Sequence, residues 1–131
     1  MTTNENKTEL DQLMLEAAET GLSIDDIAPI CARLKVDARH LVNELALAVA
    51  NGFISQAFDF DLCSQVMNGL EGVVAQLAVD GKTPEPALSI YLAFDAGEFK
   101  RSGDPIEVCP AEKYTRPMIE RILLERIDDR R

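Results

Sequence analysis

The stretch at residues 60–81, FDLCSQVMNGLEGVVAQLAVDG, decides the fold class. Apolar residues recur in it at steps of four and three, the period of one helix face, over about five turns. Asp59, directly before it, is suited to cap the first turn. The stretch therefore predicts a long amphipathic helix with one apolar face, made of Leu62, Val66, Leu70, Val73 and Leu77.

Two glycines, Gly69 and Gly72, stand in the middle of this predicted helix. Each costs about 1 kcal/mol relative to Ala in a helix interior. A phosphate-cradling role would need a strand before the glycines and a loop around them, and neither is predicted. We therefore expect another helix to approach closely here.

Capping signals on both sides predict further helices at residues 8–21, 23–35, 37–52, 83–97 and 115–129. Pro29 is expected to shorten or bend the second of these, because proline disrupts a helix interior. Suitable N-cap residues precede each helix, and glycines stand where the helices end. The N-caps are Thr8, Ser23, Asp37, Thr83 (followed by Pro84) and Thr115 (followed by Pro117), and the glycines include Gly21, Gly52 and Gly97.

The segment 83–97 is apolar on nearly every side, so we expect it in the middle of the fold. Gly97 falls where a helix end favours positive φ, and two cations follow it. Residues 100–113 contain two prolines and a glycine, which predicts the longest loop. In the last helix the residues expected to face inward are Met118, Ile119, Ile122, Leu123 and Ile127.

Length and composition favour one domain built of helices. The chain has 131 residues, enough to bury a core without disulfides or metals. Aromatic residues make up only 5%, and Trp is absent, which favours helices over sheets. We predict an all-α protein: a polar N-terminal tail at 1–7 and a single compact domain at 8–131, an irregular bundle of about six helices.

The formal net charge is −10, and most of the excess lies in the N-terminal half. Residues 1–65 carry four cations and eleven anions, and residues 66–131 carry nine and twelve. Such a charge repels a phosphate backbone, so generic nucleic-acid binding is disfavoured. It favours fast association with a positively charged protein, although net charge also serves solubility alone.

The number of cysteines and the length of the apolar runs indicate the cellular compartment of the protein. Cys31, Cys63 and Cys109 are odd in number and widely spaced, which indicates free thiols in a reducing compartment. Cys31 and Cys63 lie among apolar residues and are expected in the core. The N-terminus lacks the pattern of an export signal, and the apolar runs are too short to span a bilayer. We therefore expect a cytoplasmic protein without membrane contact.

Catalytic and metal-binding motifs do not emerge from the pattern. His40 is the single histidine and lacks a ligand partner at metal-binding spacing, so we expect it to be half-exposed and without a metal. The carboxylates around residues 59–61 and 95–104 lack the alternation of a calcium-binding loop. Phosphate-binding and dinucleotide-binding motifs are absent. We expect a binding protein, with neither cofactor nor metal, rather than an enzyme.

The strongest candidate for a binding surface is the loop after residue 97. Acidic residues alternate there with apolar and aromatic ones, a mixture that suits a basic protein partner. The alternative is that Phe99 and Ile106 merely attach the loop to the core. The candidate partner-binding residues are Asp59, Asp61, Asp95, Glu98, Phe99, Asp104, Glu107, Glu112 and Tyr114.

Two segments, SIYLAFDAGEF at 89–99 and PAEKYTRPMIERIL at 110–123, resemble the C-terminal half of small acidic immunity proteins. These proteins are encoded beside bacterial contact-dependent growth inhibition and polymorphic toxin systems. The resemblance implies a cytoplasmic, non-enzymatic protein that binds a cognate toxin domain, often a basic nuclease, and blocks its active site or substrate groove. It implies no individual contact residues, because members bind unlike toxins with unlike surfaces.

Two other functions stay open from the sequence. A secretion chaperone or adaptor is also small, acidic and cytosolic, and would bind a client segment in an apolar groove, typically as a dimer. An enzyme would require carboxylates from distant parts of the chain to converge in a pocket. The sequence does not fix the oligomeric state.

Overall fold

The computed structural model describes residues 2–129, with side chains at 8–126, and within that range the protein is all-α. The helices are α1 (Thr2–Thr20), α2 (Ile24–Leu34), α3 (Ala38–Ile54), α4 (Phe60–Val79), α5 (Ala87–Ala96) and α6 (Arg116–Asp129), and a π-helical turn η1 (Ala111–Thr115) leads into α6. They form one compact domain, which confirms the predicted fold class. No helix in the described range is long and apolar enough to cross a membrane.

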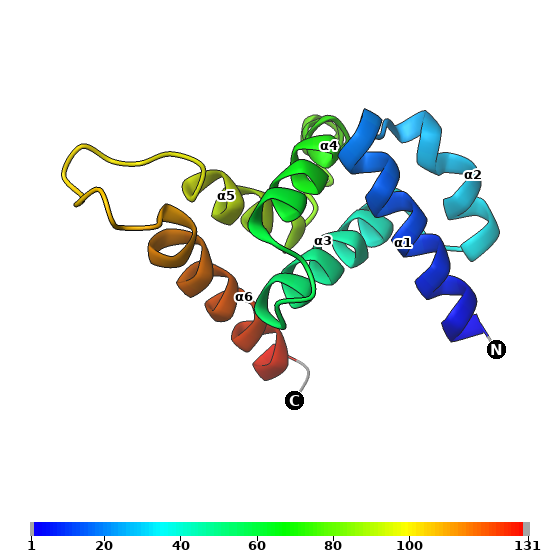
Figure 1. The fold of residues 1–131 in the computed structure, drawn as a ribbon. Helices are drawn as coiled ribbons and strands as arrows, with labels where there is room; N and C mark the ends of the chain where they lie inside the picture. Colours follow the sequence, from blue (N-terminus) through cyan, green and yellow to red (C-terminus); the bar gives the residue numbers. More distant parts are fainter. Residues whose placement is uncertain (1, 130–131) are drawn as a thin grey trace.

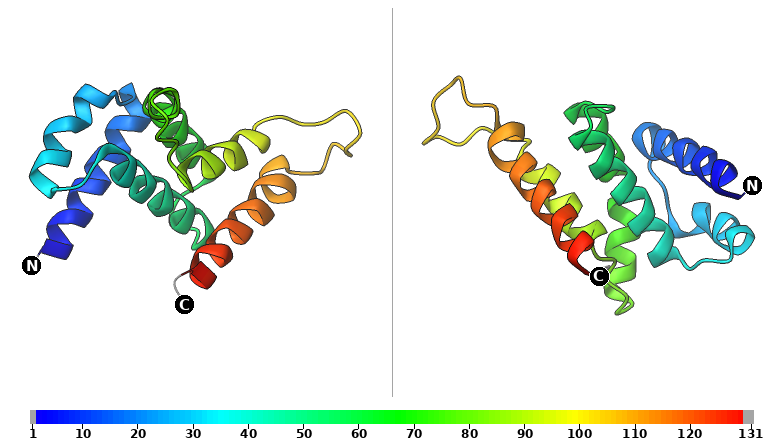
Figure 2. Two further views of the ribbon diagram at one scale, coloured as in Figure 1. Left: turned by 180° about the vertical axis from the view of Figure 1, so that it is seen from behind. Right: turned by 90° about the horizontal axis from the view of Figure 1, so that it is seen from below.

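Helices α3, α4 and α5 pack on one another and form the centre of the molecule (Figure 1). Helix α1 packs mainly on α4, α2 contacts α3, and η1 and α6 pack on α5. The two further views show the loop after α5 extending away from the helices, at the opposite end of the molecule from α1 and α2 (Figure 2). The fully buried side chains include Leu45, Val49, Leu70, Ile90 and Phe94. The central position predicted for α5 is thus confirmed.

The glycine at position 69 is explained by the contact between α1 and α4. A Cβ atom on Gly69 would lie 1.9 Å from the carbonyl oxygen of Ala17. The backbone N–H of Leu22 also donates to the Gly69 carbonyl oxygen at 2.9 Å. The close helix approach expected from the sequence is therefore confirmed here. It does not extend to Gly72, where the nearest atom would be 4.0 Å away.

The starts of α2, α3 and α4 agree with the capping pattern. Ser23 forms a capping box with Asp26, and Asp37 and Asp59 accept hydrogen bonds from the backbone N–H groups of His40 and Leu62. Helix α2 continues through Pro29 to Leu34. Local side-chain chemistry was sufficient to predict these boundaries.

Two boundaries in the N-terminal half differ from the prediction. Helix α1 begins at Thr2, so Thr8 lies inside it rather than at its cap. Its end was predicted correctly, because Gly21 has a φ of +79°. Helix α3 continues past Gly52 to Ile54. The ring of Phe58 packs against Gly52, where a Cβ would lie 2.0 Å from a ring carbon, so this glycine serves packing and not termination.

Both ends of α5 also differ from the prediction. The helix begins at Ala87 instead of after Thr83, and the N–H of Ala87 donates to the side-chain oxygen of Asn43 on α3 at 3.0 Å. Gly97 has a φ of −91°, so it is not in the left-handed conformation. Position 97 requires a glycine because a Cβ there would lie 2.1 Å from the hydroxyl oxygen of Thr115.

The last helical segment starts four residues before the expected N-cap, at Ala111. Thr115 is fully buried, and its hydroxyl donates to the carbonyl oxygen of Ala93 at 2.7 Å, so it joins α6 to α5 instead of capping. Ile119 is buried as predicted, and Ile122 and Leu123 pack partly against the core. Met118 is 40% exposed, contrary to the prediction. The side chain of Ile127 lies outside the described residues.

Candidate protein-binding surfaces

The loop after α5 is nearly balanced in charge. Residues 95–116 contain five acidic and four basic residues. Asp104 accepts hydrogen bonds from Lys113 and from the hydroxyl of Tyr114. These two donors hold the pKa of Asp104 below its usual value. Within the loop, this carboxylate is therefore occupied by the chain itself.

Glu112, another predicted contact residue, forms an ion pair within the chain. Glu112 accepts from Arg116 at 2.8 Å, one helical turn away. Tyr114 lies under the guanidinium of Arg101, whose central carbon is 3.7 Å from the ring centroid. Three of the predicted contact residues, Asp104, Glu112 and Tyr114, thus hold the base of the loop together. Glu107 is exposed.

Two cations of the loop donate hydrogen bonds to backbone carbonyl oxygens in and next to the loop. Arg101 donates to the carbonyl oxygens of Ala96 and Phe99 at 2.7 and 3.0 Å, and Lys100 donates to that of Ile106. Phe99 and Ile106 do not attach the loop to the core, because their side chains are 66% and 83% exposed. The loop therefore presents two large apolar side chains to solvent.

A second set of carboxylates converges along the adjacent faces of α4 and α5. Ser64 on α4 donates to Glu98 at 2.6 Å. Glu71 on α4 lies close to Tyr91 on α5. Burial raises the pKa of Tyr91, and the nearby charges of Glu71, Asp95 and Glu98 raise it further. These contacts bring two separate parts of the chain, residues 64–71 and residues 91–98, onto one surface.

We call this surface the α4–α5 acidic strip and define it as Asp61, Glu71, Asp95 and Glu98. On α4, Asp61 precedes Ser64 by three residues and Glu71 follows Ser64 by seven. These spacings place both carboxylates on the side of the helix that carries Ser64. Within the described residues, none of the four carboxylates makes an ion pair. Three of them were predicted contact residues, whereas Glu71 was missed. No spacing from another predicted contact residue indicated it, because Glu71 is ten residues from Asp61.

The remaining predicted contact residue, Asp59, serves a structural role. Its carboxylate accepts from the N–H of Leu62 at 2.8 Å and caps α4, as the sequence indicated. Burial of the neighbouring Cys63 thiol, and to a smaller extent the charge of Asp59, raises the pKa of that thiol to about 12. Cys63 is therefore a protonated thiol and a poor nucleophile at neutral pH.

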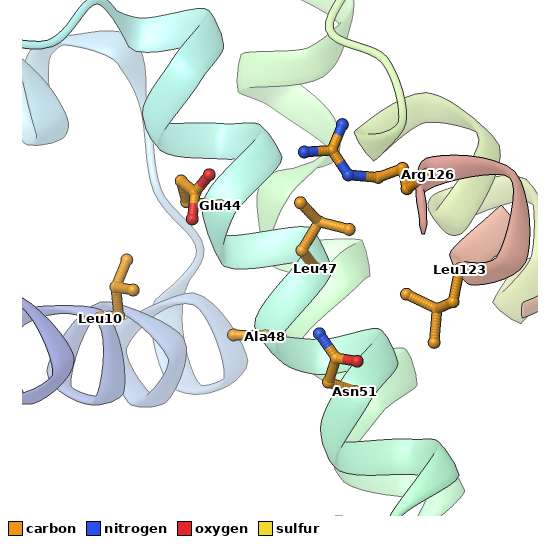
Figure 3. A pocket seen from close by; sticks show the side chains of 7 residues that line it. All are labelled: Leu10, Glu44, Leu47, Ala48, Asn51, Leu123 and Arg126. Carbon is orange, nitrogen blue, oxygen red and sulfur yellow. The ribbon is translucent and has the colours of Figure 1, made fainter. Parts of the chain in front are cut away.

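A hollow of about 280 Å³ lies on the surface of α3 between α1 and α6 (Figure 3). Leu10 of α1 and Leu123 of α6 approach it from opposite sides, over Leu47 of α3. Glu44 and Arg126 contribute opposite charges to its rim. The hollow therefore has no net charge that would select a charged ligand.

A larger hollow of about 410 Å³ lies between α1 and α4 and is lined almost entirely by apolar side chains. We call it the α1–α4 wedge and define it by its lining residues, Asp11, Met14, Leu15, Val49, Ala57, Phe58, Leu62, Cys63 and Val66.

Among the described residues, no group of three or more histidine, cysteine or carboxylate side chains is placed to hold a metal ion. His40 is exposed, with its Nε2 3.9 Å from Glu44. Cys31 and Cys63 are buried, as predicted, and Cys109 is exposed.

Comparison of the chain with protein-family models, curated proteins and solved structures finds no match.

Proposed function

We propose that this protein is a stoichiometric, non-enzymatic inhibitor that binds a basic toxin domain, such as a nuclease, through the α4–α5 acidic strip. The resemblance of residues 89–99 and 110–123 to immunity proteins is the source of the toxin assignment. The observation that supports the surface is that Glu71, Asp95 and Glu98 lie around Tyr91, on the adjacent faces of α4 and α5, without ion pairs among the described residues. We also propose that the protein acts in the cytoplasm.

The charge arrangement explains why the strip is favoured over the loop. The loop carboxylates Asp104 and Glu112 are paired with cations of the same chain, so a partner would have to displace those cations. The strip carboxylates carry no such partner in the described part of the chain, and their field is available to a cationic surface. Unpaired like charges on one face raise the rate of encounter with an oppositely charged protein.

Phe99 supplies the apolar part of the proposed contact. It follows Glu98 directly, and its exposed ring is held by a loop whose backbone is bonded to Arg101. Large aromatic side chains on rigid supports are the usual anchors of protein interfaces, because little conformational entropy is lost on binding. The strip would then set the association rate and Phe99 the dissociation rate.

The first test is a binding and inhibition assay with the polypeptide encoded by a neighbouring gene as the candidate toxin domain. Purified protein is titrated into the domain, with mass measured by light scattering and nuclease activity measured in parallel. We expect a one-to-one complex and loss of activity at equimolar protein. A complex whose nuclease stays fully active would contradict the inhibitor proposal.

Charge reversal then tests the surface. The pair Glu71→Lys and Asp95→Lys is compared with Glu19→Lys and Asp25→Lys, which make the same charge change on α1 and α2. We expect the strip pair to slow association about tenfold at low salt, within the range known for electrostatic steering, and the control pair to slow it less. An equal or larger effect of the control pair would place the contact elsewhere.

One observation favours the second candidate, a secretion chaperone or adaptor. The α1–α4 wedge is an apolar hollow of the kind that receives a client segment. A chaperone would form a complex in which the partner keeps its activity, and would be expected to dimerise. The same light-scattering and activity measurements therefore separate the two functions.

A further inference from the structure

The α1–α4 wedge arises from the way its two helices meet. Helices α1 and α4 run in the same direction and touch at Ala17 and Gly69. Toward their N-terminal ends they separate, as Figure 1 shows, and Val49 of α3 lies between them. The contact that requires a glycine at position 69 thus also opens a hollow one to two turns before it.

Apart from Asp11, the residues that line the wedge are apolar. Val49, Cys63 and Val66 are buried at the floor. Leu15 lies at the edge of the wedge, next to apolar side chains, and is nevertheless 57% exposed to solvent. A large aliphatic side chain that lines an apolar hollow and is still more than half exposed gains free energy when a partner covers it.

The described residues that line the wedge carry charge of one sign only. Among the described lining residues Asp11 alone is charged, and none is a lysine or arginine. Asp59 lies near the floor residue Cys63. Cationic groups along the edges of an apolar partner would therefore meet complementary charge.

We propose that the α1–α4 wedge binds an amphipathic helix of a partner polypeptide, with large aliphatic side chains on one face and lysine or arginine along its edges. A groove between two helices, floored by a third, suits a helix that inserts side chains spaced by three and four residues. The wedge uses Leu62, Cys63 and Val66, whereas the acidic strip uses other faces of α4. The proposal therefore goes beyond the proposed function and does not depend on it.

Methionine methyl NMR on the full chain provides a direct readout, with ¹³C-labelled methyl groups. Met14 lines the wedge, whereas Met118 is exposed on α6 and Met67 is buried in the core. The probe is an 18-residue helical peptide of leucine and lysine, with leucines at helical spacing. We expect a saturable shift of the Met14 methyl and none of the Met118 methyl. Spectra of Met14→Leu and Met118→Leu variants assign the signals.

Two control peptides test the stated chemistry of the occupant. The first keeps the lysines but replaces the leucines of the apolar face by serine, and should not shift Met14. The second keeps the leucines but replaces every lysine by glutamate, and should bind at least tenfold more weakly at low salt. Absence of any Met14 shift at millimolar lysine peptide would overturn the proposal, as would equal binding of the glutamate peptide.

Matched leucine variants test the location. Leu15→Ala should weaken binding of the lysine peptide about tenfold, the effect of losing one buried leucine contact. Leu124→Ala removes a leucine of similar exposure, 63%, from α6 and should leave binding unchanged. Equal losses in the two variants would refute the wedge as the site. Phe99→Ala, which removes the apolar part of the contact proposed for the toxin domain, should also leave peptide binding unchanged, so the two proposals fail separately.

Discussion

Replacing Gly69 by alanine tests the contact on which both the core and the wedge depend. Helix propensity alone would favour alanine by about 1 kcal/mol. The new Cβ, however, would lie 1.9 Å from the carbonyl oxygen of Ala17, and 2.5 Å from its carbonyl carbon. Backbone atoms of α1 cannot rotate away as a side chain would, so the whole helix must move outward by more than 1 Å to restore ordinary contact.

The expected cost follows from two terms. Overpacking of a close contact costs about 1–3 kcal/mol or more. Moving α1 also strains the hydrogen bond from the Leu22 N–H to the Gly69 carbonyl oxygen, now 2.9 Å long and worth about 1 kcal/mol. After subtracting the propensity gain, Gly69→Ala should lower the free energy of unfolding by about 2 kcal/mol. The assay is urea unfolding followed by circular dichroism.

Gly72→Ala is the matched control one turn further along α4. Its Cβ would be 4.0 Å from the nearest atom, so only the propensity gain remains and the variant should be as stable as the parent or more stable. If both variants raise the stability equally, the close contact between α1 and α4 is not present in solution. Opposite signs of the two changes would support it.

Three further predictions concern the C-terminal region and the thiols. Thr115→Val should lower the free energy of unfolding by about 1–3 kcal/mol, measured in urea, because the carbonyl oxygen of Ala93 loses its buried donor. A disulfide reagent at pH 8 should modify Cys109 quickly and Cys31 and Cys63 only after unfolding, because the last two thiols are buried; rapid reaction of all three would contradict this burial. Because the pKa of Asp104 is lowered in the folded protein, its contribution to stability is present above the ordinary carboxyl pKa and is lost as the pH falls through the folded value. In NMR titrations, Tyr114→Phe should raise that pKa, and an unchanged midpoint would remove the tyrosine from the interaction.

The candidate surface could be predicted in part. The sequence located Asp95, Glu98 and Phe99, because acidic and aromatic residues cluster visibly after α5. It grouped them with Asp104 and Glu112, whose charges are neutralised by Lys113 and Arg116. Sequence proximity does not reveal which cation a carboxylate meets, so the predicted acidic loop is in fact nearly balanced.

The sequence by itself determined what depends on neighbours along the chain. The apolar period of α4, the caps at Ser23, Asp37 and Asp59, and the end of α1 at Gly21 all follow from interactions within one or two turns. Such interactions are present in any conformation that forms the helix, so their signals survive without knowledge of the fold.

Only the tertiary structure decided features that join distant segments. The first N–H of α5 donates to Asn43, 44 residues away, and the hydroxyl of Thr115 donates to Ala93, 22 residues away. The strip likewise requires α4 to lie against α5, and the wedge requires α1 to diverge from α4 after touching Gly69. No local pattern encodes these pairings, because they are set by which apolar faces pack together and at what separation.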